Sequence, residues 1–165
     1  MSSLAPFITL RQLIPDDFMD VAVLLNELTE GVPVADRDED RSHFSKLLSH
    51  EGTSIFGLEL EGTIVSCATL HILPNMTYGG RPYCLAENVV TLRAHQGRGY
   101  GKLVMNTLKE AAWSANAYKI MLLTGQDRGV KGFYESLGYT ADQKFGMVLR
   151  RVPTYKPPQA EHTGR

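Results

Sequence analysis

Three glycines at alternate positions, Gly97, Gly99 and Gly101, stand between an apolar run and a stretch with helical periodicity. Glycine has no Cβ, so successive backbone N–H groups here can turn toward one anion, and the positive end of the following helix points to the same place. The segment 96–102 therefore predicts a phosphate-binding loop between a strand and a helix, with an anionic ligand.

Two other kinds of phosphate loop fit the spacing less well. A P-loop places Ser or Thr after Gly-Lys to bind magnesium, whereas Leu103 follows Lys102 in this chain. A dinucleotide-binding loop needs a third glycine three positions after the second, and Lys102 stands there. A glycine-rich turn without a ligand remains an alternative, although turns rarely need three alternating glycines.

Two segments carry a resemblance to a known family. Residues 96–101, QGRGYG, resemble the acetyl-CoA pyrophosphate loop of the GNAT superfamily of N-acetyltransferases, whose pattern is Gln or Arg, two residues, Gly, one residue, and Gly or Ala. Residues 133–139, FYESLGY, resemble the superfamily's Phe-Tyr-x-x-x-Gly-Phe/Tyr segment and follow at the matching distance. The resemblance covers most of 6–151 and is specific over about 85–139. It implies an enzyme that transfers an acetyl group from acetyl-CoA directly to a primary amine.

The resemblance implies a mixed α/β (α+β) fold, with a mostly antiparallel central sheet splayed around the acetyl-CoA site and about four flanking helices. Alternation of apolar residues predicts strands at 7–11, 55–60, 64–70, 83–91, 119–124 and 145–150. Helical periodicity predicts helices from 15–17 to just before Gly31, over 37–49 with Asp36 as the candidate N-cap, over 100–116 and over 130–137.

Length and composition suit one domain with its own core, because the chain has 165 residues of which 43% are hydrophobic. We expect that domain over 1–152 and a flexible tail over 153–165. The formal net charge of −1 gives no electrostatic footprint for nucleic acid. No apolar run reaches the roughly 18 residues of a membrane span, and no basic-then-apolar leader opens the sequence. We therefore expect neither a nucleic-acid nor a membrane partner.

The two cysteines, Cys67 and Cys84, lie in apolar stretches without Cys-x-x-Cys spacing or adjacent histidines. This pattern predicts buried, reduced thiols rather than a disulfide, a metal site or a nucleophile. We expect no bound metal and a cytoplasmic location.

Direct acetyl transfer needs a neutral amine, a polarised carbonyl and a proton donor for the leaving thiolate. Tyr134 is the candidate general acid, because a phenol with a pKa of about 10 stays protonated at neutral pH. It also stands where the GNAT segment carries its tyrosine. Simple packing of the ring is the alternative, and in that case water or Tyr139 would supply the proton.

Glu87 is the candidate base, because an acidic side chain on the strand before the loop can face the acceptor. An ordinary salt-bridged strand residue is the alternative. Strand alternation predicts that Glu87 shares a face with Val89, and that Asn88 shares the other with Val90. His71 is a weaker candidate for the base or for substrate contact. His95, beside the loop, is expected to face solvent.

The resemblance also implies how acetyl-CoA is held. Pantetheine would hydrogen-bond along 89–91 like a short extra strand, and a backbone N–H where two strands diverge would polarise the acetyl carbonyl. Asp127 stands near a position where many relatives carry asparagine, so its role is open. The expected acetyl-CoA contacts are Val89, Val90, Thr91, Gln96, Gly97, Arg98, Gly99, Tyr100, Gly101, Lys102, Asp127 and Tyr134.

The acceptor is the least defined partner. Residues 86–91 and 118–122 are similar to the corresponding stretches of glucosamine-phosphate and aminoalkylphosphonate acetyltransferases, so we expect a small amine metabolite. An aminoglycoside and a protein amine are the alternatives, and the exposed connection 74–82 could carry specificity or be a solvated turn. We also expect a homodimer. A noncatalytic module that binds acyl-CoA stays open, but it would need neither Tyr134 nor Glu87.

Overall fold

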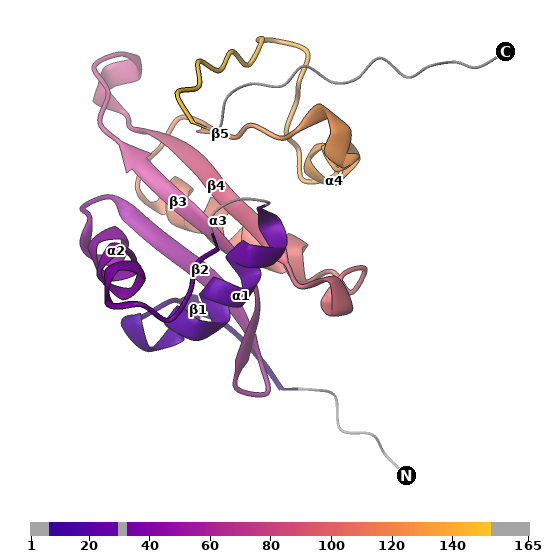
Figure 1. The fold of residues 1–165 in the computed structure, drawn as a ribbon. Coiled ribbons are helices and arrows are strands. Elements are labelled where there is room, and N and C mark those ends of the chain that lie inside the picture. The colour runs from indigo at the N-terminus through magenta and orange to yellow at the C-terminus, as the bar shows by residue number, and fades with distance from the viewer. Residues whose placement is uncertain (1–6, 30–32, 153–165) are drawn as a thin grey trace, which may run out of the picture.

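The computed structural model of the protein describes residues 7–29 and 33–152, so the predicted tail 153–165 and the predicted helix end at Gly31 lie outside the described residues. One sheet has the strand order β1-β2-β3-β4-β5 (Figure 1). Its strands are β1 (Ile8–Gln12), β2 (Thr53–Leu60), β3 (Thr63–Leu73), β4 (Tyr83–Thr91) and β5 (Ile120–Met121). Only β4 and β5 pair in parallel. The predicted mixed, mostly antiparallel sheet is confirmed.

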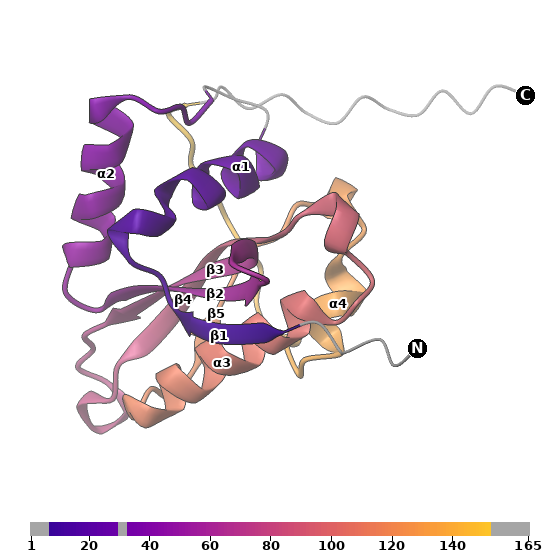
Figure 2. The same ribbon diagram turned by 90° about the horizontal axis from the view of Figure 1, so that it is seen from below.

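Helices cover both faces of the sheet (Figure 2). The described residues form the helices α1 (Phe18–Leu28), α2 (Asp38–Ser49), α3 (Tyr100–Ser114) and α4 (Lys131–Glu135), with short 3-10 turns η1 (Pro15–Asp17), η2 (Tyr78–Gly80), η3 (Arg93–His95) and η4 (Gln126–Arg128). α1 and α2 lie on one face and α3 on the other. The predicted number of helices is therefore confirmed, although α3 and α4 are shorter than predicted.

Two apolar clusters, one on each face, hold these layers together. The α1–α2 cluster includes Phe18, Val21, Leu24, Phe44, Ile55, Ile64, Cys67 and Val90. The α3 cluster includes Leu58, Val65, Ala68, Leu70, Cys84, Ala86, Val104, Met105 and Leu108. The helical members recur every three or four residues, which is why each helix buries one stripe. Full burial of one such side chain is worth about 1.5–3 kcal/mol.

The β2–β3 hairpin turns at Glu61 and Gly62, whose φ angles of 50° and 87° are both positive. A two-residue turn of this hand matches the twist of the flanking strands, and Leu60 pairs with Thr63 across it. The hairpin predicted from the glycine is confirmed.

β4 and β5 pair over a short distance and then separate. The paired residues are Cys84 with Ile120 and Leu85 with Met121. β4 continues to Thr91. Among the described residues no strand pairs with the β5-facing edge of β4 beyond Leu85. The splayed sheet that the resemblance implies is therefore present, and β5 ends at Met121 rather than at 124 as predicted.

A β-bulge at Asn88 changes which way the end of β4 faces. Asn88 has a φ of 51°, and the pairing with β3 shifts by one residue at this point. Val89 consequently packs against the α3 cluster with Ala86, whereas Val90 belongs to the α1–α2 cluster. The prediction that Glu87 and Val89 share a face is wrong, because an extra residue in a strand interrupts simple alternation.

The strand predicted at 145–150 is also wrong. These residues are irregular, and Phe145 and Met147 are 97% and 91% exposed. A strand needs a partner edge as well as an alternating sequence, and the alternation alone does not provide one. The predicted N-cap at Asp36 is wrong as well: Arg37 precedes α2, and the Asp36 carboxylate accepts a hydrogen bond from Arg41.

Candidate active site

The predicted phosphate-binding loop joins η3 to α3. Gly97 and Gly99 have φ angles of 74° and 81°, a left-handed conformation that favours glycine. At both positions, no described atom beyond the adjacent residues of the chain lies within 4 Å of the place that a Cβ would occupy. Gly99 is also the N-cap of α3, so no side chain caps the first backbone N–H groups of this 15-residue helix. The loop thus presents uncapped N–H groups and open space, as a phosphate requires.

Gly101 serves a different purpose from the other two glycines. A Cβ there would lie 3.2 Å from Thr91 Oγ1 and 3.4 Å from Cζ of the Phe133 ring. Its missing side chain therefore lets the first turn of α3 pack closely against the end of β4 and against α4. This contact joins the two sequence segments, 96–101 and 133–139, into one site.

Side-chain hydrogen bonds connect the end of β4 to the loop and to β3. Gln96 Nε2 donates a hydrogen bond of 3.0 Å to the Thr91 carbonyl oxygen. The Ser66 hydroxyl donates to the Val90 carbonyl at 3.2 Å and lies 2.7 Å from the Thr91 hydroxyl. The side chain of Gln96 thus orders the loop. Sequence analysis missed Ser66, although a serine inside the apolar run of β3 was a usable signal.

The remaining loop residues differ in exposure. Arg98 and Lys102 are exposed, so their cations are accessible at the mouth of the loop. Tyr100 is buried in the α3 cluster, which leaves its backbone rather than its ring for a ligand. His95 was expected to face solvent, but it is half-buried, and its Nδ1 atom is buried without a hydrogen-bond partner in the described part of the chain. The ring centroids of Tyr100 and His95 lie 6.4 Å apart.

Tyr134 and Glu87 lie on opposite faces of the sheet, because Tyr134 packs against the α3 cluster with Ala86 and Glu87 is the next residue of β4. Tyr134 packs against the α3 cluster and near the rings of Phe133 and Tyr139, with centroids at 5.1 and 6.0 Å. Burial raises the pKa of Tyr134, the cation of Arg128 acts in the opposite direction, and the charge of Glu87 adds to the rise. The phenol therefore stays protonated at neutral pH, and its neighbourhood includes the candidate base.

A cavity of about 600 Å³ lies beyond the ends of β4 and β5. Three segments line it: the end of α1 with Asn26, Glu27, Leu28 and Thr29, then Arg93 of η3, and Asp127 and Arg128 of η4. Glu27 Oε2 accepts a hydrogen bond of 2.9 Å from the Arg93 backbone N–H, and the Arg128 guanidinium donates one of 3.1 Å to the Leu28 carbonyl. The lining of the cavity therefore includes two arginines and two acidic residues. Sequence analysis missed Arg93 and Arg128, which no local pattern connects.

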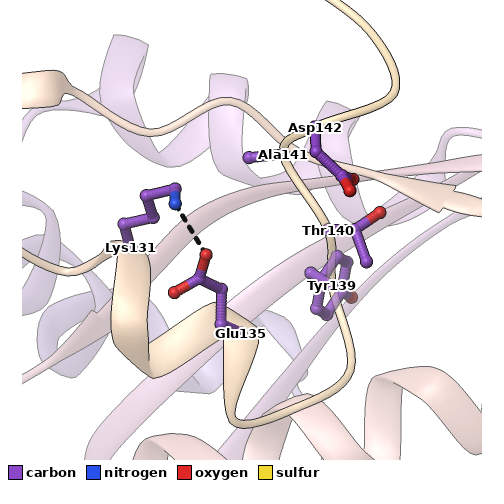
Figure 3. A pocket seen from close by; sticks show the side chains of 6 residues that line it. All are labelled: Lys131, Glu135, Tyr139, Thr140, Ala141 and Asp142. Atoms are coloured by element: carbon purple, nitrogen blue, oxygen red, sulfur yellow. Dashed lines mark hydrogen bonds and ion pairs between the residues drawn. The ribbon is translucent and has the colours of Figure 1, made fainter.

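A second cavity, of about 430 Å³, lies beside α4 (Figure 3). Its lining includes Lys131, Glu135, Tyr139 and Asp142. The Lys131 ammonium donates a hydrogen bond of 2.6 Å to Glu135, one turn away on the same helix. Because its cation is already paired, this cavity offers a weaker anion site than the loop at 96–102.

Cys67 and Cys84 are buried and free, as predicted, and they belong to clusters on opposite faces of the sheet. Burial raises the pKa of the Cys67 thiol to about 12, so this thiol is not a nucleophile at neutral pH.

Within 7–29 and 33–152, no group of three or more His, Cys, Asp or Glu side chains could hold a metal ion. Over the same residues, no helix is both long and apolar enough to cross a membrane.

Comparison with known proteins matches both motifs. The model of the acetyltransferase (GNAT) family matches residues 18–139, which include the glycine loop and the Phe-Tyr segment. The chain belongs to the GNAT acetyltransferase family. A glucosamine 6-phosphate N-acetyltransferase from Trypanosoma brucei brucei is 31% identical over 137 residues, which cover 82% of this chain and 90% of that protein.

Solved GNAT structures agree with the fold. A putative acetyltransferase from Agrobacterium tumefaciens str. C58 superposes with a TM-score of 0.81 at 39% identity, over 87% of this chain and 99% of that chain. An aminoglycoside N-acetyltransferase in complex with CoA superposes with a TM-score of 0.76 over 92% and 99% of the two chains. At 15% identity that second likeness concerns the fold alone.

As a GNAT acetyltransferase, the chain is an enzyme that uses acetyl-CoA to acetylate amines. Acetyl-CoA supplies an activated acetyl thioester. The structure fits this cosubstrate, because Gly97 and Gly99 leave open space beside uncapped N–H groups, and because no strand of the described residues pairs with this edge of β4 beyond Leu85.

Proposed function

We propose that this GNAT enzyme acetylates the primary amine of a small metabolite that also carries an anionic group, such as an amino sugar phosphate or an aminoalkylphosphonate. The observation that carries the proposal is the mixed charge of the 600 Å³ cavity, where Arg93 and Arg128 occur together with Glu27 and Asp127. The similarity to a glucosamine 6-phosphate N-acetyltransferase supports an amino sugar phosphate in particular.

The charges of the cavity match those of such an acceptor. Guanidinium groups bind phosphate through charge-assisted hydrogen bonds, and carboxylates and helix-terminal carbonyls favour an ammonium group. The end of α1 contributes the Leu28 carbonyl and the Glu27 carboxylate, while η3 and η4 contribute the two arginines. A substrate with both charges would satisfy both groups, whereas a neutral amine would leave the arginines without an anion.

Glu87 and Tyr134 are proposed as the base and the acid. Glu87 would take a proton from the ammonium group on the α1–α2 side of the sheet. Tyr134, on the α3 side, would give its proton to the departing thiolate. The short pairing of β4 with β5 leaves the opening through which an acetyl group could reach the amine. Each role uses a residue on the face where its reaction partner would lie.

Acetyl-CoA is proposed to bind along the end of β4 and in the loop. The backbone of Val89, Val90 and Thr91 would bond pantetheine. The N–H groups of 97–102 would bond pyrophosphate, with the exposed Arg98 and Lys102 adding positive charge. Asp127 lines the acceptor cavity, so we propose for it an acceptor role instead of the cofactor role expected from its sequence position.

Release of free CoA thiol, measured with acetyl-CoA and an amine panel, tests the function. The panel contains glucosamine 6-phosphate, glucosamine, 2-aminoethylphosphonate, ethanolamine, an aminoglycoside and a lysine peptide. We expect a kcat/KM for the phosphorylated or phosphonylated amines about 10- to 100-fold above that for their uncharged analogues, since one charge-assisted hydrogen bond is worth about 1.5–3 kcal/mol. Equal rates for glucosamine and its phosphate would contradict the proposal, and preference for the aminoglycoside or the peptide would select an alternative acceptor.

A homodimer, a single domain over 1–152 and a cytoplasmic location complete the proposal. The apolar side chains of Phe145, Met147 and Leu149 are exposed, and a second copy of the chain is a partner that would cover them. Light scattering coupled to gel filtration measures the mass, and a Phe145→Ser variant should dissociate such a dimer.

The two free cysteines suit a reducing compartment and support the proposed cytoplasmic location.

A further inference from the structure

A row of three side chains connects the end of α2 to the middle of the sheet. Thr53 Oγ1 lies 3.0 Å from His50 Nδ1 and 2.9 Å from His71 Nδ1. Thr53 begins β2 and is 6% exposed, His71 is half-buried on β3, and His50 is exposed just after α2. A buried hydroxyl is thus held between two imidazole rings, one of which reaches solvent.

The single hydrogen of the Thr53 hydroxyl couples the tautomers of the two histidines. A hydroxyl has one hydrogen, so Thr53 can donate to only one ring and must accept an N–H from the other. If His50 accepts at Nδ1, His71 must carry its hydrogen on Nδ1, and Nε2 of a neutral His71 is then free to accept a proton. Because His50 is exposed, it can adopt the required tautomer by exchange with water.

The strand register makes His71 a diagonal neighbour of the candidate base on the same face of the sheet. His71 pairs with Leu85, and Thr69, two residues earlier on the same face, pairs with Glu87. The Cα atoms of diagonal neighbours in an antiparallel pair lie about 7–8 Å apart, so long side chains at these positions can reach each other. Since Nδ1 of His71 is turned to β2, Nε2 lies on the side of the ring nearer to β4, the strand that carries Glu87.

The turn before β2 holds the row in place. Gly52 has a φ of 77°, and its carbonyl accepts a hydrogen bond of 2.7 Å from the Ile72 N–H. A Cβ at position 52 would lie 2.5 Å from the Ile72 carbonyl oxygen. Glycine therefore lets the corner between α2 and β2 close onto the end of β3, beside His71.

We propose that His71 receives at Nε2 the proton that Glu87 removes from the acceptor's ammonium group, and that Thr53 and His50 hold His71 in the tautomer able to do so. This rests on the proposed role of Glu87. The ammonium N–H bond breaks as an O–H bond forms on Glu87, and the amine nitrogen keeps its electron pair. That O–H bond breaks as Nε2–H forms, which makes His71 an imidazolium and restores the Glu87 carboxylate. The imidazolium then releases one proton to water.

Nitrogen-15 NMR of the histidine side chains tests the tautomers directly in the full chain at pH 8. The expected result is hydrogen on Nδ1 of His71 and on Nε2 of His50, each assigned by comparison with a His71→Asn and a His50→Asn variant. The reverse pair of tautomers, with hydrogen on Nε2 of His71, would overturn the proposal.

Kinetics with the acceptor identified by the amine panel test the proton transfer. Thr53→Val removes the hydroxyl and should lower kcat about tenfold without changing the affinity for acetyl-CoA, whereas Thr53→Ser keeps the hydroxyl and should retain most of kcat. If Thr53→Val does not fold, His71→Asn serves instead, because an asparagine amide can still donate to Thr53 but cannot accept the proton. It should retain the melting temperature and lose kcat.

The combination with Glu87→Gln separates this proposal from the proposed function. If both residues lie on one path, adding His71→Asn to Glu87→Gln should cause no further loss of kcat. If His71→Asn keeps the wild-type kcat while Glu87→Gln lowers kcat, only the role of His71 is overturned and that of Glu87 stands. An unimpaired Glu87→Gln would overturn the role of Glu87, and with it the proton transfer to His71.

Discussion

The guanidinium of Arg128 donates a 3.1 Å hydrogen bond to the carbonyl oxygen of Leu28, a residue 100 positions earlier in the chain. The bond joins the segment before α4 to the end of α1, and it places a cation at the wall of the 600 Å³ cavity that we propose for the acceptor. The same cation lowers the pKa of Tyr134, against the effect of burial. One arginine therefore both lines the proposed acceptor cavity and acts on the candidate acid.

Replacing Arg128 by Gln should raise the KM for a phosphorylated amine about 10- to 100-fold, because one charge-assisted hydrogen bond to the anion is lost. The affinity for acetyl-CoA should not change. The pKa of Tyr134 should move further upward, since a charge that lowers it has been removed. Steady-state kinetics and an ultraviolet titration of the phenols measure both effects. Arg150→Gln, at an exposed arginine outside the cavity, is the control, and equal KM values in the two variants would refute the role of Arg128.

Gly99→Ala should weaken acetyl-CoA binding at least tenfold, because its methyl group would enter the space left for phosphate. Gly62→Ala is a matched control: its φ of 87° is also left-handed, its Cβ also meets no atom within 4 Å, and it lies in the β2–β3 turn. Strain should cost each variant about 1–2 kcal/mol of stability. Calorimetric titration should show weaker binding only for Gly99→Ala, and equal affinities would exclude the phosphate loop.

Glu87→Gln should lower kcat/KM for the amine most strongly near neutral pH, where nearly all of the acceptor is an ammonium ion that must lose a proton. As the pH rises toward the pKa of the amine, free amine accumulates and the loss should shrink. A rate profile from pH 6.5 to 9.5 measures this trend. A loss that is constant across the profile would assign Glu87 to positioning or to structure.

Tyr134→Phe should reduce kcat about 10²- to 10⁴-fold while the melting temperature and acetyl-CoA affinity stay near those of the wild type. The ring and its packing remain, and only the proton donor is removed. Tyr139→Phe is the control, because both tyrosines are half-buried in the same aromatic group. An acetyl donor with a more acidic thiol should restore part of the rate to the Tyr134 variant. Wild-type turnover in that variant would leave Tyr134 as a packing residue.

Alkaline pH should destabilise the protein through Cys67. Burial raises the pKa of this thiol from 9.0 to about 12. The contribution of this thiol to stability is fully present below pH 9. Above pH 9 the unfolded chain loses the thiol proton while the folded chain keeps it. The free energy of unfolding therefore falls by about 1.4 kcal/mol per pH unit. Urea denaturation at pH 8, 9.5 and 10.5 should show a shallower fall for Cys67→Ala. The raised pKa of Tyr139 acts in both proteins and does not affect the comparison.

Much of this architecture could be predicted from short sequence patterns. The loop at 96–101, the turn at Gly62, the stripe of α1 and the burial of both cysteines follow from backbone preferences and apolar spacing, which operate over a few neighbouring residues. The same patterns failed at 145–150, where alternation predicted a strand but the described residues are irregular and pair with no strand.

The tertiary structure alone decided which residues meet. The bulge at Asn88 sends Val89 and Val90 to opposite faces, Gly101 admits the Phe133 ring, and strand register puts His71 beside the strand that carries Glu87. Arg128 reaches Leu28 only because α1 and η4 converge at the open ends of β4 and β5. Such contacts join residues tens of positions apart and depend on strand order and register, which no local preference specifies. Local sequence patterns therefore specified most of the helices and strands and the glycine loop, whereas the packing of those elements formed the cavity that we propose for the acceptor.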